Sequence, residues 1–279
     1  MAYVKRTWVT GSVIEVEKYF TFTYKNNKVT RMPKVNQTPE AMQKVNERNA
    51  VKKLRRLLNT NFGHNDMHLI LTYEMSKRPD CKEAAKKDIE KFLRNLRKRY
   101  KKSGYELRYV SVAEYGKRSI HFHLVINKGI SINEIAETWP HGRIHIHPLD
   151  NSGDYSQLAE YLIKQTRKTF NDPDRAIYKK RWSSSTNLKQ PEAIVEVVKS
   201  ESWKEMPVAP AGYYLITDSI YTDVSDLTGY PYQYYKCIAI DNNAQERMMK
   251  RYGKRKRKNN KSCCKHSSRR NNEKYEPKA

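Results

Sequence analysis

The sequence has little acidic charge and no long apolar run. Its 279 residues include 55 Lys and Arg but only 30 Asp and Glu, so the formal net charge is +25 at pH 7. No stretch approaches the roughly 18 to 20 apolar residues that a membrane-spanning helix needs. The first residues, MAYVKRTWVT, also lack the apolar region of a secretory signal. We therefore expect a cytoplasmic protein with no membrane partner.

Cysteine is scarce as well, with only four residues in the chain. Cys263 and Cys264 are adjacent, and Cys81 and Cys237 lie far apart, so the cysteines do not form a disulfide framework. Reduced thiols in a reducing compartment are the simpler account. The segment Cys263-Cys264-Lys265-His266 does not have the spacing of a known zinc finger.

The excess of positive charge favours a polyanionic partner. Twenty tyrosines are interleaved with Lys and Arg, and they supply stacking faces beside charges that neutralise phosphates. An anionic membrane would instead require a basic helix with a broad apolar face, and the most basic segment is almost devoid of apolar residues. Nucleic acid is therefore the expected partner.

The most informative segment is IHFHLVIN, from Ile120 to Asn127. Apolar residues alternate there with His121 and His123, so a β-strand would send the apolar set into a core and both histidines to the opposite face. Two histidines in this spacing lie roughly 6.6 to 6.8 Å apart along the backbone and can converge on one ion. A polar strand face is the alternative interpretation.

A carboxylate completes the predicted metal site. The preceding segment, ELRYVSVAEYG, contains Glu114, and a hairpin through residues 116–119 would set Glu114 beside His121 and His123. Two neutral imidazoles and one carboxylate leave positions open for water and a phosphate oxygen, as Mg²⁺ or Mn²⁺ needs in phosphoryl transfer. We therefore expect Mg²⁺ or Mn²⁺ as the cofactor.

A second histidine doublet, His145-Ile146-His147, competes with the first. It lies on a predicted short strand, but no acidic residue precedes it in a paired strand, and Pro148 ends the strand at once. We rank it second as the metal pair.

The coarse pattern predicts an α+β protein. Thr38 and Pro39 are typical of a helix start, and Ser131 with Glu134 forms a capping box. Helices are predicted at 38–60, 82–102, 131–139, 154–168 and 192–204, and strands at 3–24, 67–74, 106–115, 120–127, 142–148, 212–217 and 232–240.

In the helix 154–168, Tyr155 belongs to the predicted buried stripe, whereas Tyr161 and Lys164 share an exposed flank. A tyrosine with a lysine one turn on is a candidate covalent nucleophile. The ammonium can favour the phenolate and neutralise the charge of a phosphate.

Three motifs occur in the order and spacing of the HUH endonucleases: LTY at Leu71–Tyr73, HFH at His121–His123 and YLIK at Tyr161–Lys164. More narrowly, the stretch from about 38 to 192 resembles rolling-circle replication initiators (Rep) of small bacteriophages and bacterial plasmids. The middle motif is the most specific of the three.

The resemblance implies an HUH palm, an antiparallel sheet with flanking helices in a ferredoxin-like or RRM-like arrangement, here with a C-terminal extension. His121, His123 and Glu114 would hold the metal. Tyr161 would attack a DNA phosphate, retain the 5′ end as a phosphotyrosine and release a 3′-OH, and Lys164 would assist. The substrate would be single-stranded DNA of an origin, linear or folded as a hairpin.

The resemblance also bears on partners and on the number of nucleophiles. Position 165 is Gln, so a single-tyrosine mechanism is expected. No GxxxxGK[ST] loop occurs, which leaves unwinding to a host helicase and synthesis to a host polymerase. The expected setting is a bacterial host.

We expect four parts along the chain: a strand pair and helix at 1–66, the endonuclease core at 67–204, C-terminal strands at 205–245 and a basic disordered tail at 246–279. The expected DNA-binding residues are basic side chains near the site and in the tail: Lys117, Arg118, Arg167, Lys168, Lys254, Arg255, Lys256 and Arg257. A non-catalytic single-stranded nucleic-acid-binding protein, and a transposase or mobilisation nickase of the same superfamily, remain the alternatives.

Overall fold

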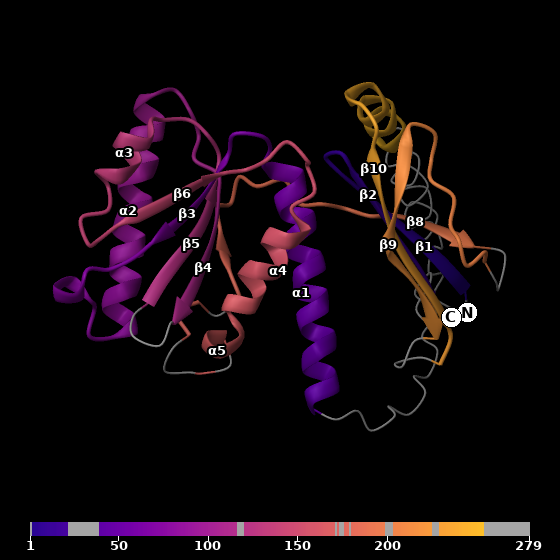
Figure 1. The fold of residues 1–279 in the computed structure, drawn as a ribbon, viewed down its shortest axis with the longest axis horizontal. Helices are drawn as coiled ribbons and strands as arrows, with labels where there is room; N and C mark the ends of the chain where they lie inside the picture. Colours follow the sequence, from indigo (N-terminus) through magenta and orange to yellow (C-terminus); the bar gives the residue numbers. More distant parts are fainter. Residues whose placement is uncertain are drawn as a thin grey trace, which may run out of the picture. The chain divides into compact units, whose positions relative to one another are not determined.

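The computed structural model describes residues 2–21, 39–115, 120–170, 172, 176–178, 180–198, 203–224 and 229–253 (Figure 1). The chain divides into two compact units. The terminal unit combines Met1–Val35 with Glu192–Ala279, and the central unit is Asn36–Pro191. None of the helices described is long and apolar enough to cross a membrane.

The central unit is built on a five-stranded antiparallel sheet in the order β6-β3-β5-β4-β7. Its strands are β3 (Met67–Leu71), β4 (Tyr109–Tyr115), β5 (Ile120–Ile126), β6 (Ile144–Pro148) and β7 (Ser183–Ser184). With α2 (Lys82–Lys102) between β3 and β4, and α3 (Ile132–Ala136) between β5 and β6, the succession is βαββαβ. This is the ferredoxin-like arrangement, and it confirms the predicted α+β class.

One face of this sheet is apolar because its strands alternate in the expected way. Leu69, Phe122 and Leu124 are fully buried, and they pack against the apolar stripe of α2, which includes Ile89 and Leu96. Helices α2 and α3 cover this side of the sheet in Figure 1.

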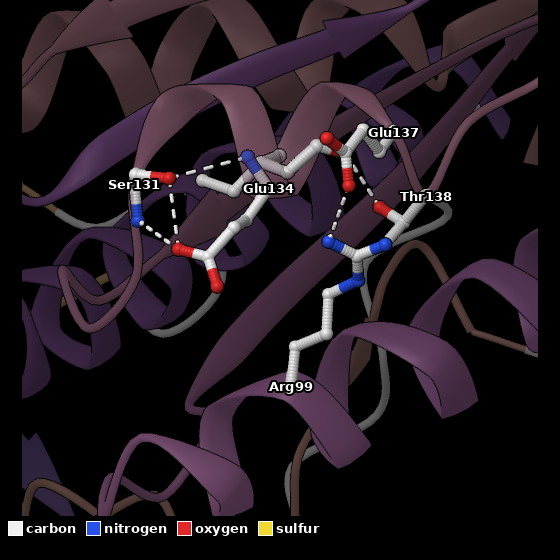
Figure 2. A network of polar contacts seen from close by, with 6 residues as sticks. Arg99, Ser131, Glu134, Glu137 and Thr138 are labelled. Atoms are coloured by element: carbon white, nitrogen blue, oxygen red, sulfur yellow. Dashed lines mark hydrogen bonds and ion pairs between the residues drawn. The ribbon is translucent and has the colours of Figure 1, made fainter.

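A local motif begins α3. The hydroxyl of Ser131 accepts from the backbone N–H of Glu134, and a carboxylate oxygen of Glu134 accepts from the backbone N–H of Ser131 (Figure 2). The predicted capping box is therefore confirmed. Arg99 of α2 donates to Glu137 at 2.8 Å, which ties the end of α3 to α2.

The opposite face of the sheet is covered by α1 (Pro39–Asn61) and α4 (Ser156–Gln165). Val110, Val112 and Val125 of the sheet form a second apolar cluster there with Leu54 and Leu58 of α1 and with Leu162 of α4. The histidines lie on this same face, so α4 is packed beside them.

The terminal unit holds another five-stranded antiparallel sheet, in the order β8-β1-β2-β10-β9. Its strands are β1 (Ala2–Thr10), β2 (Val13–Thr21), β8 (Ile194–Val198), β9 (Tyr213–Val224) and β10 (Pro231–Ala239). Gly11 has φ 61° in the turn between β1 and β2, a conformation that glycine adopts without strain. A helical segment, 242–253, follows β10.

Two expectations differ from this fold. The predicted helix at 192–204 is wrong, because residues Ile194–Val198 form β8 and pair with β1; their β-branched side chains favour a strand. The expected division at 66 also differs, because β2 pairs with β10 and thereby joins the N-terminal strands to the C-terminal ones. Residue 38 and the tail beyond 253 lie outside the described residues.

Candidate active site

The β4–β5 hairpin places the predicted carboxylate beside the first histidine doublet. Glu114 is the direct cross-strand partner of His121, so both side chains lie on one face, and His123 follows on that face two residues along β5. A hydrogen bond of 2.9 Å joins His123 Nε2 to Glu114 Oε2. His123 is only 2% exposed, whereas Glu114 is 23% exposed, so this pair is open to solvent from the side of the carboxylate.

A third histidine, His68 of β3, lies next to this pair. The register sets Ile70 opposite His123, and His68 therefore points to the same face one pair further along. The imidazole rings of His68 and His123 stack with centroids 5.6 Å apart. Sequence reasoning missed His68, although its alternation with Met67 and Leu69 could have placed it on the histidine face.

The second doublet also lies on this face. His145 pairs with Ile70 and His147 with His68 across β3 and β6, and the His68 and His147 ring centroids are 6.0 Å apart. The two doublets are thus separated by the single strand β3. Both histidines of β6 are exposed, whereas His123 of the first doublet is buried against Glu114.

Tyr161 lies against the histidines from α4. Its ring centroid is 5.4 Å from that of His123 and 6.1 Å from that of His68, edge-on to both rings. Tyr161 is 39% exposed, whereas Tyr155 at the start of the helix is 4% exposed and donates its hydroxyl to the backbone oxygen of Asp150. The structure therefore brings Tyr161 and the first doublet together and keeps Tyr155 in the core.

The surroundings of Tyr161 favour its neutral phenol. Burial raises the pKa of Tyr161, the charge of Glu114 raises it further, and a hydrogen bond with Gln165 opposes them. We expected the Lys164 ammonium to favour the phenolate, but the net shift of this pKa is in the other direction. Lys164 is exposed in the last turn of α4.

The histidines are held as neutral imidazoles. Burial, together with the charges of His123 and His147, lowers the pKa of His68 to about 3. Burial also lowers the pKa of His121, although Glu114 acts against it. The neutral ring is the form that binds a metal ion.

The donor set of this face suits a hard divalent cation in chemical kind. Glu114, His121 and His123 supply one carboxylate and two imidazoles, and His123 Nδ1 is buried without a hydrogen-bond partner. Among the described residues, however, no group of three or more His, Cys, Asp or Glu already has a metal-binding arrangement. The Glu114–His123 hydrogen bond occupies the position between the two donors.

Most of the expected DNA-binding residues fall outside the described parts. Arg167 is exposed on α5 (Arg167–Phe170) and forms an ion pair with Glu47 of α1 at 2.5 Å. The Lys168 side chain, Lys117 and Arg118, and the four tail residues Lys254, Arg255, Lys256 and Arg257 lie outside the described residues.

Comparison with known families supports a role in replication. Residues 66–169 match a family model of replication-associated proteins of the ORF2 type, which is consistent with a replication initiator. The matched segment is less than half of the chain, and it contains His68, Glu114, both doublets and Tyr161. No curated protein and no solved structure matches the chain.

Proposed function

We propose that this protein initiates rolling-circle DNA replication by nicking and rejoining single-stranded DNA through a 5′-phosphotyrosine on Tyr161. The observation that carries the proposal is the position of Tyr161. A half-exposed tyrosine on a rigid helix lies within 5.4 Å, ring to ring, of His123, which is itself bonded to Glu114. The match to replication-associated proteins over residues 66–169 supports the same conclusion.

In the proposed reaction the Tyr161 hydroxyl oxygen attacks a backbone phosphorus. The new bond joins this oxygen to phosphorus, the bond from phosphorus to the 3′ oxygen breaks, and the 3′ oxygen takes up a proton as the phenol loses one. One phosphoester replaces another, so a 3′-OH can reverse the step without ATP. The raised pKa of Tyr161 means that the proton must leave during the attack, because little phenolate exists beforehand.

Glu114, His121 and His123 would hold Mg²⁺ or Mn²⁺, which when bound offsets negative charge on the non-bridging phosphate oxygens. The role of the protein is placement. The β4–β5 register fixes Glu114 against His121, and the apolar packing of α4 fixes Tyr161 above the same face. Lys164, one turn along α4, would neutralise a neighbouring phosphate.

Nicking of a labelled single-stranded origin oligonucleotide tests the proposal. With Mn²⁺ present, the wild-type protein should form an adduct that survives denaturing electrophoresis, and Tyr161→Phe should form none. Tyr105→Phe is the matched control, because Tyr105 is 55% exposed in the same unit but belongs to the segment that follows α2. An adduct formed equally well by Tyr161→Phe would remove Tyr161 as the nucleophile.

The same assay separates the two doublets. The double variant His121→Ala with His123→Ala should lose Mn²⁺-dependent nicking while still binding the oligonucleotide. The corresponding double variant of His145 and His147, on the other side of β3, should retain nicking. The reverse outcome would move the metal to the β6 doublet.

A further inference from the structure

One face of the terminal unit's sheet has two ends of different character. At one end, Ile14 and Val16 of β2 and Cys237 of β10 form an apolar cluster with Ala244 of the helical segment 242–253. At the other end the same face carries aromatic rings and lysines in place of aliphatic side chains. We call this end the aromatic–lysine platform, defined by Tyr3, Lys5, Lys18, Phe20, Trp203 and Tyr230.

The rings of the platform are in contact with one another. Tyr3 of β1 is opposite Phe20 of β2, with ring centroids 5.3 Å apart, and the Trp203 ring lies edge-on to Tyr3 at 5.5 Å. Tyr230 stacks on Phe20 at 3.9 Å. Phe20 is buried, whereas Tyr3, Trp203 and Tyr230 are half-buried and keep surface open to solvent.

Two lysines stand directly beside these rings. Lys5 is the cross-strand partner of Lys18, and the Lys18 ammonium lies 5.6 Å from the Trp203 ring centroid. Burial lowers the pKa of Lys18, and the charge of Lys5 lowers it further. Lys5 also faces Glu196 of β8, so Lys18 holds the less compensated charge. Like charges directly opposite each other are unfavourable, and an anion bound there would relieve the repulsion.

The segment that carries Trp203 is fixed to the sheet. Gln233 of β10 is fully buried, and its amide nitrogen donates to the backbone oxygen of Lys204 at 2.8 Å. The oxygen of the same amide accepts from Lys18 at 2.8 Å. One side chain therefore positions both the ring-bearing segment and the ammonium, as a binding surface prepared in advance requires.

We propose that the aromatic–lysine platform binds single-stranded DNA, with bases stacked on Trp203 and Tyr3 and phosphates beside Lys18 and Lys5. Open aromatic faces next to cations are the means by which proteins hold unpaired bases, since every base has a stacking face. Duplex DNA hides those faces. The site goes beyond the proposed nicking function, because it lies on the other unit and shares no residue with the Tyr161 centre.

Fluorescence anisotropy with a labelled oligothymidine tests the proposal, using the full chain without added metal so that nicking does not interfere. Trp203→Ala should weaken binding about 10-fold, within the range measured for loss of one stacking ring. Trp203→Phe should retain most of the affinity. Met206→Ala is the matched control in the same segment, because Met206 is 60% exposed and has no ring. Equal affinities for Trp203→Ala and Met206→Ala would overturn the proposal.

A second pair of variants keeps the test independent of the folding of Trp203→Ala. Lys18→Gln should lower the dependence of log Kd on log salt by about 0.7, the value for one phosphate contact on a single strand. Lys18→Arg should leave it nearly unchanged. Lys250→Gln is the control for lost charge, because Lys250 is 78% exposed and paired with Glu246. An equal change for Lys18→Gln and Lys250→Gln would count against the platform.

The two proposals fail separately. At saturating origin oligonucleotide, Trp203→Ala should form the covalent adduct as fast as wild type, and Tyr161→Phe should bind oligothymidine with wild-type affinity. Absence of the adduct in every protein would end the nicking proposal alone. An equal loss of affinity for duplex and single-stranded DNA in Trp203→Ala would contradict base stacking alone.

Discussion

At the scale of single residues, the site depends on buried histidines that remain neutral. His68 is 6% exposed, and its Nε2 is buried without a hydrogen-bond partner. The position of such a residue is fixed by its neighbours on both sides, His123 and His147, and by the strand that carries it. This gives His68 a measurable effect on folding that is separate from any catalytic role.

The acid stability of the metal-free protein should reveal His68. Burial lowers its pKa from 6.5 to about 3, so between these values the unfolded chain binds a proton that the folded chain does not. The free energy of unfolding should therefore fall as the pH drops from 6.5 towards 3. His68→Phe, measured by urea unfolding in EDTA, should show a shallower fall. His64→Gln, at an exposed histidine, should follow wild type, and a wild-type slope in His68→Phe would contradict the burial of an ionisable ring.

The residues that sequence reasoning located were those with a strong local pattern. Alternation placed His121, His123 and Glu114 on one face, and helical spacing separated the buried Tyr155 from the exposed Tyr161. His68 and the shared face of the two doublets depend on which strands are neighbours. Because β3 lies between β5 and β6, three strands distant in sequence contribute to one surface, and no local pattern contains that order.

At the scale of elements, the return of the chain into β6 depends on close backbone packing. Trp139 follows α3, and its indole N–H donates to the backbone oxygen of Thr72 at 2.8 Å. Three residues later, Gly142 passes beside the end of β3. A Cβ added at Gly142 would overlap the backbone oxygen of Thr72 and lie 2.8 Å from the backbone nitrogen of Glu74.

Gly142→Ala should therefore destabilise the protein, by about 1–3 kcal/mol or more for overpacking against backbone atoms that cannot rotate away. Gly63→Ala is the matched control, because nothing lies within 4 Å of the added Cβ and its φ is not positive. Thermal unfolding should show a lower Tm for the first variant and little change for the second. Equal Tm values would show that β3 and β6 are not as closely joined as described.

Element types were predictable where periodicity and caps agreed, as for α2, β5 and the Ser131–Glu134 box of α3. The prediction failed at 192–204, where a run of Ile and Val was assigned to a helix. That segment is the edge strand β8, and it is stabilised by pairing with β1, which lies far away along the chain. Tertiary pairing of this kind overrides a weak local preference.

At the scale of the whole molecule, the chain consists of two units with separate apolar clusters. The nicking residues all lie in the central unit, Asn36–Pro191, and the aromatic–lysine platform lies in the terminal unit. Each unit therefore has its own packing to stabilise it and its own part of the proposed function.

A chain restricted to residues 36–191 should fold, as judged by a cooperative thermal transition, and should form the Tyr161 adduct with Mn²⁺. It should bind oligothymidine more weakly than the full chain, because the platform is missing. The full-length Trp203→Ala variant is the comparison, and it should reproduce part of that loss. A fragment that binds as tightly as the full chain would exclude a contribution of the terminal unit.

The central claim is that Tyr161 becomes joined to the 5′ end of cleaved DNA. Peptide mass spectrometry of the protein after reaction with a single-stranded origin oligonucleotide and Mn²⁺, followed by nuclease digestion, tests this most directly. The account predicts a nucleotide phosphate attached to Tyr161 within the α4 peptide, absent when EDTA replaces Mn²⁺. A modification on any other residue, or cleavage with no covalent protein–DNA product, would contradict it.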